Sequence, residues 1–89
     1  MRHVEIRVVG RVQGVFFRVS TRNKALELGV TGTVRNEPDG SVAIRAEAEP
    51  AVLERFVEWC RRGPANADVK RLLVTEAEPR GYAGFTITG

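Results

Sequence analysis

The spacing of apolar residues changes several times along this chain, and this pattern restricts the fold more than any other sequence feature. Strict alternation of apolar and polar residues is typical of a half-buried strand, whereas apolar residues three and four apart indicate an amphipathic helix. The segments predicted to be extended are residues 3–9, 30–36, 41–48, 69–77 and 82–88. The segments predicted to be helical are residues 17–28 and 50–62. The predicted order is therefore β-α-β-β-α-β with an added strand at the end.

Residues between these segments support the same boundaries. Pro38-Asp39-Gly40 separates two alternating runs. Proline presets the first dihedral of a turn and glycine accepts the left-handed one, so this triplet predicts a hairpin. Gly29 and Gly63 follow the two helical segments, at positions where glycine commonly ends a helix. Pro50 opens the second helix, where its missing N–H costs nothing.

Each predicted strand has one apolar face and each predicted helix one apolar stripe. Two helices packed on one side of a mainly antiparallel sheet would bury all of these surfaces. This arrangement is the ferredoxin-like α+β two-layer sandwich. With 89 residues and 43% hydrophobic residues, the chain has room for a single domain, residues 1–89. Because this fold hosts many unrelated activities, function has to be argued from particular residues.

Cysteine and histidine are nearly absent, which excludes several kinds of site. The lone Cys60 cannot form an internal disulfide, and with the lone His3 it cannot build a zinc cluster. A Ser-His-acid triad would need His3, which we expect at the frayed start of a strand. Cys60 falls on the apolar stripe of the second helix, so we expect a buried small hydrophobe there and not a nucleophile.

The charge is mildly basic, with 14 Lys and Arg against 11 Asp and Glu and a formal net charge of +3. The excess is spread along the chain, which suits an anionic small molecule or weak nucleic-acid contact, but it lacks the clustered basic stripe that would by itself favour nucleic acid. Glu58 and Arg62 have the spacing of a weak helical ion pair. Glu5 interrupts any signal-like start, and no apolar run approaches the ~20 residues of a membrane span. These features predict a cytoplasmic protein with a reduced Cys60.

The segment Gly10–Arg18 joins the first predicted strand to the first predicted helix and has the character of an anion site. Glycines allow a ligand to approach the backbone, and unpaired N–H groups at a helix N-terminus attract anions. Arg18 in the first helical turn faces the positive end of the helix dipole, which costs about 0.3–1 kcal/mol unless an anion lies between them. A solvated arginine beside an ordinary turn is the alternative, and the loop alone does not decide between the two. The segment matches neither a Walker A loop nor a dinucleotide fingerprint.

The same segment resembles the signature of the acylphosphatase family, G-x-V-Q-G-V-x-F-R. It matches that signature at Gly10, Val12, Gln13, Gly14, Val15, Phe17 and Arg18. The second family motif is similar to Gly32-Thr33-Val34-Arg35-Asn36 followed by a short turn and Gly40-Ser41-Val42, and the closing strand to Gly84-Phe85-Thr86-Ile87. The likeness runs in order over nearly the whole chain, as one acylphosphatase-like domain of residues 1–89.

Two residues depart from the family pattern. The family usually carries an aromatic residue at the position of Thr33 and a glycine at the position of Ala48. Side chains alternate along a strand, so Thr33 is expected to face away from the side that presents Asn36. The loss of the aromatic ring therefore concerns packing more than chemistry, and Ala48 has no functional explanation.

The resemblance implies hydrolysis of an acyl phosphate, a small-molecule substrate, to a carboxylate and inorganic phosphate. It implies that Arg18 binds the phosphate together with the backbone N–H groups of Gln13, Gly14, Val15, Phe16 and Phe17, and that Asn36 orients the attacking water. It implies no cofactor or metal. We expect no nucleic-acid or membrane partner, and nothing in the sequence demands more than a monomer. A carboxylate leaving group, with a conjugate acid of pKa about 4–5, departs without a general acid. Histidine and metal are therefore dispensable for this chemistry.

Three alternatives accompany this interpretation. Asn36 precedes Pro38-Asp39-Gly40 and, without the resemblance, is more simply a turn former. Residues 80–87 are similar to an RNA-recognition motif, although Gly84 displaces Phe85 to the wrong face relative to Tyr82. A domain that binds phosphate without turnover is the third possibility, against which the presence of both Arg18 and Asn36 argues.

Overall fold

Strands and helices follow one another in the predicted order. The computed structural model describes residues 1–89. Its elements are β1 (Arg2–Arg11), α1 (Phe17–Leu28), β2 (Thr31–Asn36), β3 (Val42–Ala48), α2 (Pro50–Arg62), β4 (Asp68–Ala77) and β5 (Phe85–Ile87). Both helices begin and end where the apolar spacing and the flanking glycines predict. The last strand is shorter than expected, because residues 82–84 lie outside it.

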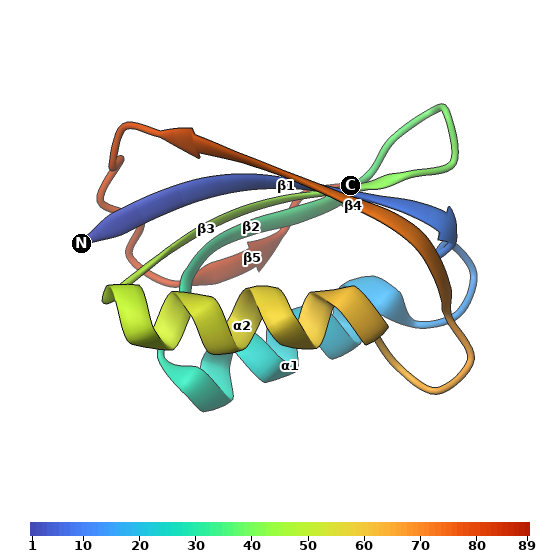
Figure 1. Ribbon diagram of the computed structural model, residues 1–89, viewed down its shortest axis with the longest axis horizontal. Coiled ribbons are helices and arrows are strands. Elements are labelled where there is room, and N and C mark those ends of the chain that lie inside the picture. The colour runs from blue at the N-terminus through green and yellow to red at the C-terminus, as the bar shows by residue number, and fades with distance from the viewer.

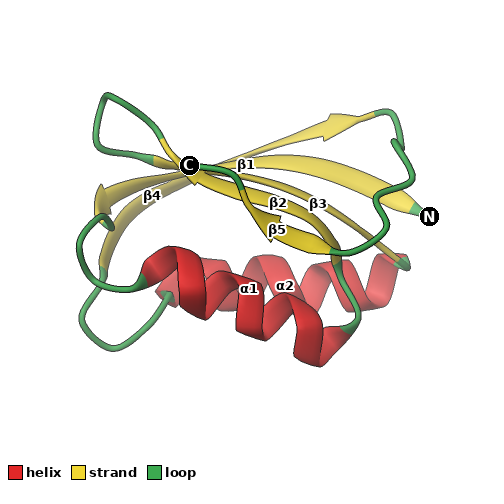
Figure 2. Cartoon of the chain, turned by 180° about the vertical axis from the view of Figure 1, so that it is seen from behind, coloured by secondary structure: helices red, strands yellow, loops and turns green.

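The strands form one five-stranded sheet in the order β4-β1-β3-β2-β5. All neighbours are antiparallel except β2 and β5, which run parallel. Figure 1 shows both helices on the same side of this sheet, and the view from behind in Figure 2 shows the opposite face without a covering helix. The predicted ferredoxin-like α+β sandwich is therefore confirmed.

The core lies between the sheet and the two helices. The alternation predicted for β1 and β3 is confirmed, since Val4 faces Ala46 and Ile6 faces Ile44 across the two strands, all of them buried. Phe56 of α2 packs edge-on against Phe85 of β5, with ring centroids 6.0 Å apart. Cys60 is also buried, as predicted, and its burial raises the pKa of the thiol, which keeps it protonated and unreactive.

The hairpin between β2 and β3 closes at the predicted triplet. The N–H of Glu37 donates to the Ser41 carbonyl over 2.8 Å, and the N–H of Gly40 donates to the Glu37 carbonyl over 3.1 Å. The Asp39 carboxylate accepts hydrogen bonds from the N–H and the hydroxyl of Ser41, which lowers the pKa of Asp39. Asn36 is thereby held at the end of a strand, directly before a rigid turn.

The expectation that His3 lies at a frayed strand end is wrong. His3 is paired with Glu47 across β1 and β3 and is only 1% exposed. Both residues project from the helix-free face of the sheet and are buried by the segment Glu78–Tyr82, which connects β4 to β5. The carboxylate of Glu47 accepts hydrogen bonds from the backbone N–H groups of Arg80 and Gly81. The cause of the burial is thus a loop distant in sequence, which local alternation does not reveal.

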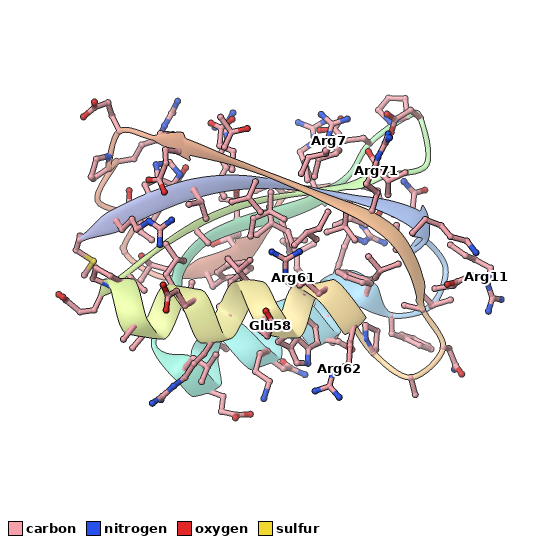
Figure 3. All side chains as sticks on the ribbon, viewed as in Figure 1. Arg7, Arg11, Glu58, Arg61, Arg62 and Arg71 are labelled. Carbon is pink, nitrogen blue, oxygen red and sulfur yellow. The ribbon has the colours of Figure 1, made fainter.

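The surface charges are dispersed, as the sequence indicates. Glu58 pairs with Arg61 at 3.3 Å and not with Arg62, so the predicted pair is corrected by one position. Figure 3 shows Arg61 and Arg62 on α2, whereas Arg7 and Arg71 lie on the sheet side of the molecule. No single basic stripe results from this arrangement.

Candidate active site

The segment between β1 and α1 turns the chain so that the helix N-terminus is uncapped. Gly14 has φ +73°, and Phe16, the residue that caps α1, has φ +61° and ψ +25°. No side chain caps this end of α1, and its first turn contains no acidic residue. A left-handed backbone costs a residue other than glycine roughly 1–2 kcal/mol, so Phe16 holds a conformation that local preferences oppose.

Backbone donors are left free along this turn. From Gln13 to Val19, no backbone N–H donates a hydrogen bond within the protein, and the first helical bond runs from Ser20 N–H to the Phe16 carbonyl at 3.0 Å. We call residues Gln13–Val19 the amide cradle. Consecutive free N–H groups at the positive end of a helix dipole form the arrangement by which proteins bind phosphate.

Arg18 lies in the first turn of α1, as predicted, and its side chain is partly exposed. No carboxylate side chain lies within ion-pair distance of its guanidinium, in contrast to Arg2, Arg7, Arg35, Arg45 and Arg61. Its Nη1 group donates instead to the backbone oxygen of Gly89. A guanidinium has five N–H donors, so most of its donors remain available to an anion.

Asn36 is the last residue of β2, and its backbone N–H donates to the same Gly89 oxygen over 3.2 Å. Arg18 and Asn36, which are far apart in sequence, therefore meet at one oxygen atom. The Oδ1 atom of the Asn36 side chain is buried and has no hydrogen-bond partner within the protein. Such an acceptor is costly to leave unpaired, which points to a donor that arrives with the ligand or with water.

A cavity of about 340 Å³ brings these groups together. It is lined by Val12, Gly14, Phe16, Phe17, Arg18, Val19, Asn36 and Ile87. Most of the predicted site residues thus border a single cavity, and Arg18 and Asn36 face it from two different elements.

Two predicted site residues, Gln13 and Val15, do not line the cavity. The Gln13 side chain points to the hairpin and donates from Nε2 to the carbonyls of Glu37 and Ser41, each over 2.8 Å. Val15 is partly buried and packs against the core. Their backbone N–H groups still belong to the amide cradle, so the prediction for these two residues concerns the backbone alone.

Sequence reasoning missed three features of the site. It assigned no role to Val19 or Ile87, which line the cavity, nor to Gly89, which joins Arg18 and Asn36. It also did not anticipate the hydrogen bonds from the Gln13 side chain to the hairpin. Ile87 and Gly89 reach the site only because β5 pairs with β2 in parallel, and no local signal predicts that pairing.

The two departures from the family pattern lie away from the cavity. Thr33 pairs with Arg45 of β3 and lines a depression on the helix-free face, whereas Asn36 borders the cavity, as the alternation predicts. Ala48 is buried at the far end of β3, and nothing in the structure explains its departure.

The segment similar to an RNA-recognition motif is not arranged to bind RNA. Phe85 is 7% exposed and packs in the core against Phe56. Tyr82 lies instead edge-on to His3, with ring centroids 5.8 Å apart, at the end of the segment that covers the helix-free face. The two aromatic rings do not share an exposed face, so they cannot form the stacking platform that such domains use.

The family model and the curated relatives identify the family of this chain. A family model described as Acylphosphatase matches residues 4–87. The acylphosphatase of Gloeobacter violaceus is 46% identical over 80 residues, which is 90% of this chain and 86% of that protein. The acylphosphatase of Thermotoga petrophila is 48% identical over 87 residues, which is 98% of this chain and 97% of that protein.

A solved structure gives the same result for the fold. The crystal structure of acylphosphatase from Bacillus subtilis is 37% identical in sequence and superposes with a TM-score of 0.97, covering 100% of both chains. Neither helix of the present structure has the length and apolar character needed to cross a bilayer.

Proposed function

Because this chain belongs to the acylphosphatase family and is a hydrolase of acyl phosphates, we propose that Arg18 and Asn36 are its catalytic residues. The reaction cleaves the carboxyl-phosphate bond to a carboxylate and inorganic phosphate. One observation carries the proposal: the Arg18 guanidinium and the Asn36 backbone N–H donate to the same oxygen of Gly89, and both residues line one cavity.

In this proposal the phosphate lies between Arg18 and the amide cradle. The backbone N–H groups of residues 13–17 donate to its oxygens, and the planar guanidinium grips two of them at once. Because no carboxylate side chain pairs with Arg18, its charge remains available for the phosphate. Phosphoryl transfer depends mainly on positioning and charge stabilisation, and these groups supply both.

Asn36 orients the attacking water. Its unpaired Oδ1 atom accepts a hydrogen bond from the water, and its backbone is held by β2 and by the hairpin that follows. An amide acts without ionising and introduces no negative charge beside the phosphate. The rigid strand end fixes the distance between water and phosphorus, which is a large part of the rate enhancement.

The remaining steps need no further side chain. The carboxylate leaves unprotonated, since its conjugate acid has a pKa of about 4–5. The proton of the water passes to the phosphate of the substrate itself. Both proposed catalytic residues come from one chain and border one cavity, so a second copy is not needed to complete the site. We accordingly propose that residues 1–89 act as a single domain, as a cytoplasmic monomer without metal or cofactor.

The test is hydrolysis of acetyl phosphate in excess chelator, with release of inorganic phosphate as the readout. We expect turnover by the wild type, and a kcat about 10²-fold lower in Asn36→Ala with little change in KM, because water orientation is lost while phosphate binding remains. The matched control is Asn23→Ala, an identical change at an exposed position of α1 outside the cavity, and we expect it to be neutral.

Two outcomes would contradict this assignment. If Asn36→Ala keeps the wild-type kcat, Asn36 does not orient the water. If the wild type binds inorganic phosphate but releases none from acetyl phosphate, the site is a binding module without turnover.

A further inference from the structure

Two exposed apolar side chains border the cavity beside the proposed phosphate site. Phe16 is 78% exposed and Val19 is 40% exposed. Both line the cavity, Phe16 as the residue that precedes α1 and Val19 from the first turn of that helix. Of the large hydrophobic residues that are exposed in this structure, the others are Met1, Leu26, Leu73 and Val74, and none of them borders this cavity.

A contribution to folding stability does not explain why the Phe16 ring is exposed. Its ring is largely in water and stacks on no other aromatic ring, unlike the neighbouring Phe17, which is 2% exposed and lies 6.0 Å from Trp59. Its backbone is also the only one with positive φ at a residue other than glycine. A strained position that displays an apolar ring at a cavity mouth is typical of a ligand contact.

The position of Phe16 relative to Arg18 defines which part of a ligand it would meet. If the phosphate lies on Arg18 and the amide cradle, the acyl group must extend from the bridging oxygen along another wall of the same cavity. Besides Gly14, Arg18 and Asn36, that cavity is lined only by apolar side chains, and Phe16 and Val19 are the exposed ones at its rim.

We infer that Phe16 and Val19 form the acyl-group subsite, and that these two side chains determine how strongly an apolar acyl group is favoured over a small one. This inference rests on the proposed function, since it takes the phosphate position from Arg18. A ring of the substrate would cover the exposed face of Phe16 and remove apolar surface from water. A small acyl group, such as acetyl, would cover less of this apolar surface.

The test compares benzoyl phosphate with acetyl phosphate in the wild type and in Phe16→Asn. Asparagine tolerates a left-handed backbone, so this variant keeps the loop conformation and removes only the apolar ring. We expect the ratio of kcat/KM for benzoyl phosphate to kcat/KM for acetyl phosphate to fall about 10- to 30-fold. Phe16→Leu, which keeps an apolar side chain, should recover most of the preference for benzoyl phosphate.

The matched control is Leu26→Asn, which removes a 59% exposed apolar side chain from the same helix outside the cavity. It should leave the ratio of the two kcat/KM values unchanged. Val19→Ser should lower that ratio in the same direction as Phe16→Asn, by a smaller factor because the side chain is smaller.

The failure of this inference is distinguishable from failure of the proposed function. An unchanged benzoyl-to-acetyl ratio in Phe16→Asn, with hydrolysis intact, would overturn the subsite. An equal loss for both substrates would also overturn it, because it would show that Phe16 only supports the loop. Absence of hydrolysis of either substrate by the wild type would instead overturn the proposed function and the subsite with it.

Discussion

Backbone N–H groups are paired with a buried carboxylate at one end of the sheet and are left without an acceptor at the other end. At the end where β1 begins, the Glu47 carboxylate is buried and accepts the N–H groups of Arg80 and Gly81. At the other end, where β1 leads into α1, the N–H groups of the amide cradle (Gln13–Val19) have no acceptor in the protein. Figure 1 shows these regions at opposite ends of the molecule.

The charged groups at the two ends differ in a corresponding way. The buried end holds an anion, Glu47, surrounded by donors of the protein itself, with His3 Nδ1 3.7 Å away. The cavity end holds a cation, Arg18, that pairs with no carboxylate side chain and donates to the backbone oxygen of Gly89. A protein gains stability by satisfying buried polar groups, and it gains an anion site by leaving donors and a cation unsatisfied. The difference indicates which end serves stability and which serves chemistry.

Removing the free cation should produce the largest effect. We expect Arg18→Ala to lower kcat/KM for acyl phosphates by about 10³-fold, with losses in both affinity and rate, because the guanidinium stabilises charge on the phosphate throughout the reaction. Thermal stability should change little. Steady-state kinetics and a melting curve measure the two quantities.

The matched control is Arg22→Ala, one turn further along α1 and outside the cavity. Amide NMR adds a direct readout: inorganic phosphate should shift the signals of the amide cradle in the wild type and much less in Arg18→Ala. Equal activity of Arg18→Ala and Arg22→Ala would show that Arg18 has no special role in catalysis, and it would contradict the assignment of chemistry to the cavity end.

Removing the buried anion should have the opposite signature. Glu47→Ala removes the acceptor of the Arg80 and Gly81 N–H groups and of a buried network, which should lower the free energy of unfolding by about 1–3 kcal/mol. The kcat of the folded fraction should stay close to that of the wild type. Glu49→Ala, at an exposed carboxylate without a side-chain hydrogen bond, should cost less than about 0.5 kcal/mol. Chemical denaturation with parallel assays separates the two effects.

The pH dependence of the folding stability gives a second test of the role of Glu47. Hydrogen bonds from the Arg80 N–H and then from Gly81 hold the pKa of Glu47 below its ordinary value of 4.5, against the opposing effect of burial. The stabilisation is therefore complete above the ordinary pKa and is lost as the pH falls through the lowered value. Glu47→Gln should be less stable near neutral pH and should show a flatter decline in acid. An acid profile parallel to that of the wild type would show that Glu47 does not carry this dependence.

The smallest effect is expected at Gln13, which joins the amide cradle to the hairpin. Gln13→Ala removes two hydrogen bonds to carbonyls and should lower the free energy of unfolding by about 1 kcal/mol. Gln13→Glu should be worse than Gln13→Ala, because a carboxylate cannot donate and would face the carbonyl oxygens of Glu37 and Ser41. If denaturation shows Gln13→Glu to be as stable as the wild type, the hydrogen bonds from Gln13 to the hairpin do not contribute to stability.

Local sequence signals predicted the elements well where each element carries its own information. The helices over 17–28 and 50–62 have both periodic apolar residues and glycines at their ends, and both were predicted with the bounds that the structure has. The last strand was predicted too long, because Ala83 and Gly84 form a bend and the strand register with β2 begins only at Phe85. Strand pairing depends on both partners, so the sequence of β5 alone does not show at which residue its pairing with β2 begins.

The sequence by itself determined the order of the elements, the hairpin and the glycine-bearing loop before a helix that begins with Phe17 and Arg18, because periodicity, turn residues and caps act over a few neighbouring residues. Only the tertiary structure decided that Arg18 and Asn36 meet at Gly89, that Gln13 fastens the loop to the hairpin, and that His3 is buried. These contacts join residues far apart in the chain. They depend on strand register and on the parallel pairing of β5 with β2, which form only when the whole sheet is assembled.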